Sequence, residues 1–274
     1  MIRKQVFSPI LFFILLLIIY SCSDSKEEDT KNYKASIAKG SEFFDKKVHL
    51  DSAFYYYNLA KEYSTDKSGK EHTYALLQIA TVQQYIGDYF GSEETITEAL
   101  ANYEGTVYKP YLYNMLAVAY DSQGKLDDAL EYYKKAYDGF EDITGKVLAQ
   151  NNIGLIYQQK NQHEKAIQLL KPLLKKYNRK VDSALILGNL GYSEYKLNRP
   201  DAYANLSQSL YLTDSLQSID LSIPTNIHLA EFFKDSDNHK AKQYAINALN
   251  AAKKPISLIN GLKYCNGLLR PAKE

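Results

Sequence analysis

The sequence predicts an all-α solenoid built from antiparallel pairs of helices. Small residues recur every 37 positions, at Ala80, Ala117, Gly154 and Gly191. Around them the same order of apolar and aromatic residues returns, most clearly in residues 113–136. A fixed period of this length is typical of stacked helical repeats, in which each unit buries its apolar face against the next.

The third unit shows how each helix pair is expected to form. Residues 111–122 carry apolar side chains at steps of three and four, which predicts an amphipathic helix. A turn follows, in which Gly124 supplies the left-handed residue that ends a helix. Residues 126–137 then form the second helix, with Asp127 and Asp128 at its positive end. Ala117 on the first helix and a second small residue at position 129 allow the two helices to approach closely.

These residues resemble the tetratricopeptide repeat (TPR), which has small residues at its eighth, twentieth and twenty-seventh positions. The third unit supplies them as Ala117, Ala129 and Ala136. The resemblance covers about residues 33–253 and implies a right-handed superhelical solenoid of five to six repeats. The repeat is longer than the usual 34 residues, and the first, fifth and sixth units match less well. Such arrays present a surface to a partner and are not typically enzymes.

The prolines carry further expectations about helix ends. Pro110, Pro200 and Pro224 are expected at helix starts, where a missing N–H group is tolerated. Pro172 falls inside the second helix of the fourth repeat, where we expect a kink or an early stop.

The first 22 residues differ from the rest of the chain. Arg3 and Lys4 precede an apolar run, 10–20, that is too short to span a bilayer and is typical of a signal peptide. The run ends at Ile19-Tyr20-Ser21-Cys22, which resembles the bacterial lipobox, apart from the large Tyr20. We therefore predict a lipoprotein signal peptide over 1–21, with lipid on Cys22. An uncleaved anchor, or an ordinary cleavage site beside a chance cysteine, are the alternatives.

The segment after Cys22 and the end of the chain complete the predicted organisation. Residues 22–32 are expected to be an acidic tether, and Lys26-Glu27-Glu28 resembles an export signal of Gram-negative surface lipoproteins. The expected location is therefore the cell envelope, as an outer-membrane lipoprotein that is periplasmic or surface-exposed, with the surface preferred. Residues 254–274 are expected to form a capping helix and tail, or the opening of a further repeat. Cys265, the only other thiol, is expected to be structural.

Composition and motifs exclude several functions. The formal charge is +1, from 33 basic and 32 acidic residues, so the electrostatic footprint of a nucleic-acid-binding protein is absent. The five histidines form no metal-binding spacing, and neither a phosphate-binding loop nor a nucleophile elbow occurs. We therefore expect no enzymatic activity, no metal and no cofactor.

The TPR resemblance also implies a binding groove. In such arrays the first helix of each pair lines a concave surface, through its second, fifth, sixth, ninth, twelfth and thirteenth positions. In this chain those positions, including the apolar Val118 and Leu155, are rich in amides and aromatic rings. The predicted groove residues are Gln84, Tyr85, Asn114, Asp121, Asn151, Asn152, Gln158, Asn189, Tyr192, Tyr195 and Lys196.

Amide side chains can pair with both the donors and the acceptors of an extended peptide, and tyrosines add contact area with a polar tip. The predicted function is a membrane-anchored scaffold or adaptor that binds a peptide segment or partner protein. Alternatives are a TPR sensory module of a signalling system, an outer-membrane assembly lipoprotein, and glycan capture. For each asparagine alone, a structural role between repeats is an equally good interpretation.

Overall fold

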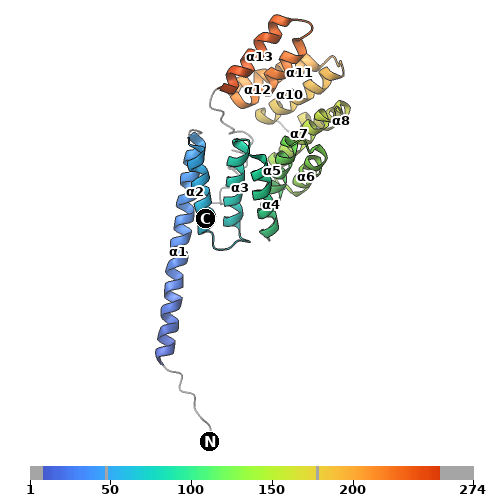
Figure 1. Cartoon of the computed structure of the whole chain (residues 1–274). Coiled ribbons are helices and arrows are strands. Elements are labelled where there is room, and N and C mark those ends of the chain that lie inside the picture. The colour runs from blue at the N-terminus through green and yellow to red at the C-terminus, as the bar shows by residue number, and fades with distance from the viewer. Residues whose placement is uncertain (1–8, 47–48, 177–178, 254–274) are drawn as a thin grey trace.

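The computed structural model describes residues 9–46, 49–176 and 179–253, and every regular element in these ranges is an α-helix (Figure 1). The helices are α1 (Pro9–Lys46), α2 (Leu50–Tyr63), α3 (Lys70–Tyr85), α4 (Tyr89–Asn102), α5 (Lys109–Ser122), α6 (Leu126–Gly139), α7 (Ile143–Gln159), α8 (His163–Leu170), α9 (Leu173–Lys176), α10 (Lys180–Lys196), α11 (Ala202–Ser215), α12 (Ile219–Phe233) and α13 (Asn238–Lys253).

The helices form a solenoid of antiparallel pairs, as the sequence predicts. Each pair consists of a first or A helix (α1, α3, α5, α7, α10, α12) and a second or B helix (α2, α4, α6, α8, α11, α13). Each helix packs on the next along the chain, and neighbouring A helices also touch, as α3 touches α5 and α10 touches α12. The pairs therefore stack in chain order, from α1 and α2 at one end to α12 and α13 at the other (Figure 1).

The turn from A helix to B helix repeats with the same 37-residue spacing as the small residues. A residue with positive φ stands in four of these turns, at Gly87, Gly124, Asn161 and Asn198. In each turn the next N–H donates to the carbonyl five residues before it, at 2.7 to 2.9 Å, as Lys125 does to Tyr120. This geometry satisfies carbonyls at the end of the A helix, and glycine or asparagine provides it with the least strain.

The small residues of the repeat lie where A and B helices come closest. Ala80 and Ala117 have no exposed surface. A Cβ atom on Gly154 would stand 3.0 Å from the side chain of Leu170. A Cβ atom on Gly191 would stand 3.0 Å from the backbone of the following B helix, so this contact is tighter still.

The third repeat follows its prediction closely, and the prolines follow theirs in part. Helix α5 carries Pro110 in its first turn, and the break between α8 and α9 falls at residues 171–172, beside Pro172. Pro200 precedes α11 by two residues. The prediction for Pro224 is wrong: it lies inside α12, which starts five residues earlier at Ile219 behind the N-cap Ser218. Because Ser218 satisfies the orphan N–H of Leu221, the helix begins at the serine and not at the proline.

Helix α1 continues without a break from Pro9 into the first repeat (Figure 1). The predicted tether, 22–32, lies within this helix, and the described side chains of Lys26, Glu27 and Glu28 are exposed. Among the helices described here, none is long and apolar enough to cross a membrane. The predicted cap, 254–274, with Cys265, lies outside the described residues.

Candidate binding face on the A helices

The predicted groove residues lie on one face of the A helices, here called the A-helix face. The A-helix face consists of the second, fifth, sixth, ninth, twelfth and thirteenth repeat positions of each A helix. The structure divides the predicted residues into two groups. Some are buried in contacts between successive repeats, and others keep access to solvent.

Amide side chains pair between successive A helices. Asn189 on α10 donates from Nδ2 to Oδ1 of Asn151 on α7 at 2.8 Å, and both side chains are buried. Asn152 on α7 makes a longer bond of 3.4 Å to Oδ1 of Asn114 on α5. The partners are 38 residues apart in each case, so the spacing of the repeat brings the amides together.

Glutamines bind the backbone of the next repeat. Gln158 is buried, and its Nε2 donates to the carbonyl of Asn189 at 2.6 Å and to Oγ of Ser193 at 2.7 Å. Gln84 on α3 donates to the carbonyl of Met115 at 2.8 Å. These contacts hold neighbouring A helices in register, because a buried amide that loses its partner is destabilising.

Asp121 is the one acidic residue in the predicted set. Burial raises the pKa of its carboxyl, and a hydrogen bond of 2.7 Å from Nε2 of Gln159 opposes that rise. A half-buried carboxylate with this single described partner can accept a further donor from a ligand.

A second cluster surrounds Tyr192 on α10. Its ring stacks on His228 of α12 with centroids 4.3 Å apart, and the edge of His163 approaches at 6.0 Å. Burial lowers the pKa of His228 to about 4, and burial and the Lys196 ammonium lower the pKa of His163. Both rings are therefore neutral at pH 7. Sequence reasoning did not find His228 as a site residue, because its stacking partner Tyr192 comes from a different repeat.

The exposed edge of this cluster is charged. Lys196 forms an ion pair with Glu231 of α12, and its ammonium also lies over the rings of Tyr192 and Tyr195, 5.3 and 5.7 Å from their centroids. Tyr195 donates from its hydroxyl to the carbonyl of Glu231 at 3.0 Å. The cluster therefore joins the last two repeats through groups that water can still reach.

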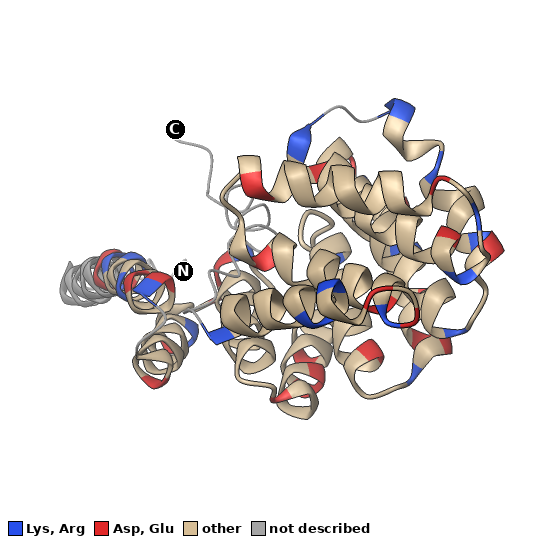
Figure 2. Ribbon diagram, turned by 90° about the horizontal axis from the view of Figure 1, so that it is seen from above, with Lys and Arg blue, Asp and Glu red and all other residues tan. Residues whose placement is uncertain are grey.

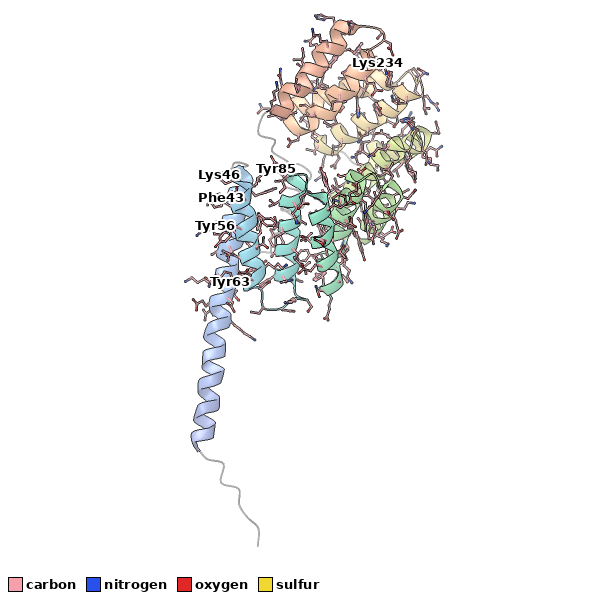
Figure 3. All side chains as sticks on the ribbon, in the orientation of Figure 1. Phe43, Lys46, Tyr56, Tyr63, Tyr85 and Lys234 are labelled. Carbon is pink, nitrogen blue, oxygen red and sulfur yellow. The ribbon has the colours of Figure 1, made fainter. Side chains whose placement is uncertain are left out.

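The A-helix face is closed at one end of the array and open at the other. On α3, the side chains of Leu77, Gln78 and Thr81 are 1%, 1% and 3% exposed. On α12, at the position equivalent to Leu77, Ile227 is 51% exposed. Tyr85 lies at the end of α3 (Figure 3), and burial followed by the charge of Asp220 on α12 raises its pKa. The curvature of the array therefore brings α12 close to α3.

A buried Ser–His–Glu arrangement lies outside this face, in the joint between the first two repeats. His72 contacts Oγ of Ser64 through Nδ1 at 2.8 Å, and its Nε2 stands 3.8 Å from Glu98. Ser64 is buried, and its hydroxyl donates to the carbonyl of Lys61. Because the hydroxyl already donates to the end of α2, the geometry is that of a structural contact and not of an exposed nucleophile.

Basic and acidic residues are nearly balanced in the chain, 33 against 32. In the view of Figure 2, basic and acidic residues are interspersed along the ribbon. Over the described ranges, no group of three or more His, Cys, Asp or Glu side chains is placed to hold a metal ion.

Comparison with known proteins identifies the repeat. Models of the tetratricopeptide repeat match residues 71–142 and 148–175. No curated protein matches the chain.

Solved structures share the fold at low sequence identity. Aspartyl phosphate phosphatase F from Bacillus subtilis has a TM-score of 0.65 and 16% identity, over 89% of this chain and 76% of its own. The Rap conjugation gene regulator of plasmid pLS20, in complex with the Phr* peptide, has a TM-score of 0.60 and 14% identity, over 92% and 80%. The apo form of RapI has a TM-score of 0.60 and 17% identity, over 80% and 97%. The chain therefore contains tetratricopeptide repeats, at 71–142 and 148–175, and its fold is a TPR solenoid.

Proposed function

We propose that the protein is a non-enzymatic adaptor that binds an extended peptide segment of a partner protein on its A-helix face. The observation that carries this proposal is the half-buried, uncharged surface of α7, next to the charged edge of α10. Asn152 and Leu155 on α7 keep partial access to solvent, and Lys196 on α10 is exposed. The buried pair of Asn151 and Asn189 ties α7 to α10, the two helices that present these groups.

This surface suits a peptide backbone. Asn152 makes only a long hydrogen bond of 3.4 Å among the described contacts, so its amide can take a stronger partner. Leu155 offers apolar contact one turn further along the helix, and Tyr195 offers a ring on the next A helix. A peptide that uses all three would gain both backbone hydrogen bonds and buried area.

A pull-down from detergent-solubilised cells tests the proposal. The test variant is Asn152→Ala/Leu155→Ala, which changes two half-buried side chains of the A-helix face. The matched control is Lys134→Ala/Asp138→Ala, which changes two exposed side chains of the B helix α6. Both variants should keep the helical circular dichroism of the wild type.

We expect a partner that the wild type and the control both retain and the test variant loses. A partner that all three proteins retain would place binding on the B helices or the chain ends, and would overturn the proposal. Titration of the purified protein with a fragment of the recovered partner would then measure the loss, expected to be roughly 10-fold or more for two interface side chains.

We also propose that lipid on Cys22 anchors the protein at the outer membrane, with the part of α1 that follows Cys22 as the stalk that carries the repeats. The support is the lipobox resemblance and the continuity of α1, which runs without a break through Lys46 into the first repeat. Cell fractionation of a Cys22→Ala variant tests it. If the lipid anchor exists, the variant should leave the membrane fraction and lose normal processing. Unchanged membrane association of the variant would reject the lipid anchor.

A second candidate function is a sensory module that takes a short free peptide. Its support is the fold likeness to the Rap regulator solved with the Phr* peptide, over 92% of this chain. Recovery of a free peptide, in place of a protein, from the purified wild type would favour this candidate. The assembly and glycan-capture alternatives predict loss of envelope integrity on deletion and sugar-dependent stabilisation, respectively.

A further inference from the structure

One carboxylate on the A-helix face has no cation beside it. Burial raises the pKa of two carboxyls in the described chain, Asp121 on α5 and Glu194 on α10. Glu194 also feels the charges of Lys171 and Arg199, which act in the opposite direction. For Asp121, a hydrogen bond from Gln159 is the one opposing influence among the described residues. A half-buried negative charge without a positive neighbour is destabilising, and a cation from outside the chain would relieve it.

The lysines nearest to Asp121 in this repeat and the next are paired with other carboxylates. Lys125, four residues further along the chain, forms an ion pair with Glu93 of α4. Lys160, just past the end of α7, forms an ion pair with Asp127. The described part of the chain therefore leaves the charge of Asp121 without a cationic partner.

Asp121 lies at one end of a strip of the A-helix face, here called the α5–α7 strip. At the other end of the strip Asn152 donates to Asn114 at 3.4 Å, and at this end Gln159 donates to Asp121 at 2.7 Å. Both bonds join α7 to α5, and they lie seven residues apart on each helix. Two helical turns, about 10.5 Å along the axis, therefore separate them.

Apolar side chains lie in the middle of the α5–α7 strip. Val118 on α5 and Leu155 on α7 occupy the same repeat position, between the two hydrogen bonds, and both keep partial access to solvent. Tyr133 on α6 is buried close to Asp121, since burial, followed by the charge of Asp121, raises the pKa of its hydroxyl. The strip thus presents an amide at one end, apolar surface in the middle and a carboxylate at the other end.

These three features match one short piece of extended peptide. An extended chain advances about 3.3 Å per residue, so three residues span the distance between the two hydrogen bonds. The backbone of one residue can pair with the Asn152 amide, and an apolar side chain can lie on Val118 and Leu155. A basic side chain about three residues away can then reach Asp121. An ammonium or guanidinium group would form a charge-assisted hydrogen bond there.

We propose that the partner segment carries a lysine or arginine whose side chain pairs with Asp121 on the α5–α7 strip. This inference rests on the proposed function, because it describes the same peptide that binds Asn152 and Leu155. Asp121 then determines which segments are accepted. A segment without a basic residue would bury the carboxylate further without pairing it, and an acidic one would repel it.

A peptide library tests the preference for a basic residue. The probes are nine-residue peptides, N-acetylated and C-amidated, with leucine fixed at the centre and the other positions randomised. Purified full-length protein on beads selects from the library, and the bound peptides are sequenced. We expect lysine and arginine to be enriched at least ~3-fold at one position within about four residues of the leucine, because a charge-assisted bond is stronger than a neutral one.

Two substitutions at Asp121 and one control assign the preference to this carboxylate. Asp121→Asn keeps an acceptor for Gln159 and removes the charge, so the basic enrichment should disappear and the best peptide should bind about 10-fold more weakly. Asp121→Lys should shift the enrichment to aspartate and glutamate at the same position. Asp128→Asn, at an exposed position of the B helix α6, is the matched control and should select like the wild type.

Thermal unfolding separates a ligand-binding role of Asp121 from a structural one. Because Asp121→Asn removes an unpaired, half-buried charge, the free variant should unfold at the same temperature as the wild type or at a higher one. A thermal midpoint lowered by more than about 3 °C would make Asp121 a structural residue and overturn the proposal.

The remaining outcomes distinguish this inference from the proposed function. Bound peptides without a basic preference, or a preference that survives Asp121→Asn, would overturn the Asp121 site and leave the adaptor function standing. A second library with free N-termini tests the other source of an ammonium group. Selection there of peptides without a basic side chain would assign Asp121 to a peptide N-terminus and overturn the proposed lysine or arginine. If the wild type selected no peptide from either library, both proposals would fall.

Discussion

The N-terminal and C-terminal halves of the array pack differently, although they use the same repeat. From α1 to α7 a continuous cluster of buried side chains, rich in aromatic rings such as Tyr57, Tyr111 and Phe140, runs through the stack. From α11 to α13 the buried cluster is much smaller and centres on Leu206, Leu229 and Phe233. The A-helix face is closed on α3, beside the large cluster, and open at Ile227 on α12, beside the small one.

Position in the array accounts for the small size of the last cluster, because an inner pair buries both of its faces against neighbours, whereas the last pair buries one. The aromatic residues of the first repeats fill the wider gaps between their helices. We therefore expect the N-terminal half to carry most of the stability and the C-terminal half to keep more of the accessible surface.

The largest loss of stability should come from shortening a buried leucine in each of the two clusters. Leu112 on α5 and Leu229 on α12 are both fully buried, so Leu112→Ala and Leu229→Ala should each cost about 3 kcal/mol locally. Leu112→Ala should lower the main unfolding transition in urea. Leu229→Ala should instead separate an early transition of the last pair, visible by hydrogen exchange. If both variants instead unfolded in the same single transition, the two halves would not differ in stability as described.

A smaller loss of stability should distinguish alanine substitutions at two glycines that occupy the same repeat position, Gly154 and Gly191. A Cβ on Gly191 would meet Leu206 N and Ala202 O at 3.0 Å, so the backbones must move, and Gly191→Ala should cost about 2 kcal/mol. A Cβ on Gly154 meets only the side chain of Leu170, which can shift. Gly154→Ala should therefore be within about 1 kcal/mol of the wild type, because alanine favours the helix. Thermal unfolding of both variants provides the comparison.

Acid should weaken the C-terminal half through His228. Burial lowers the pKa of this ring to about 4, against an ordinary value of 6.5. The unfolded chain therefore binds the proton more readily than the folded one. The stability from the neutral ring is fully present above pH 6.5 and is lost as the pH falls toward 4, by on the order of 2 kcal/mol.

The variant His228→Phe isolates this effect. It keeps a ring against Tyr192 and removes the titrating group, although it also loses a hydrogen bond to the Gly188 carbonyl. Urea unfolding at pH 7.5 and 4.5 should show a smaller acid-dependent loss in the variant than in the wild type. An equal loss in both proteins would place the acid sensitivity elsewhere, such as in His72, whose pKa burial also lowers.

The smallest effect should distinguish the two amide pairs. Asn189→Ala leaves the buried Oδ1 of Asn151 without its 2.8 Å partner and should cost about 1.5 kcal/mol. Asn152→Ala removes a 3.4 Å bond from a half-buried position and should cost about 0.5 kcal/mol. Chemical denaturation of both variants tests this order, and a reversed order would make Asn152 a structural residue.

Several features of the fold could be predicted from residue spacing alone. The 37-residue period predicts the helix pairs, and Gly124 predicts the left-handed turn that the structure shows. Asn161 and Asn198 occupy the same turn, and asparagine at a glycine position is a signal that the period could have revealed. Pro224 misled the prediction, because a proline tolerated inside a helix looks the same in sequence as one at its start.

The site was less accessible to prediction. The spacing assigns the amides of α5, α7 and α10 to one side of each A helix. It could not show that Asn151, Asn189 and Gln158 are buried by one another, since each partner comes from another repeat. The same reason hides His228, whose ring stacks on Tyr192 from α12.

Residue spacing is enough to predict the repeat, its helices and their turns, because these depend on residues close together in the chain. Which positions of the A-helix face are closed, as at Thr81, and which are open, as at Ile227, becomes visible in the folded array alone. Exposure at these positions depends on how the whole array curves. That curvature sums the packing of every pair, so no single repeat contains it.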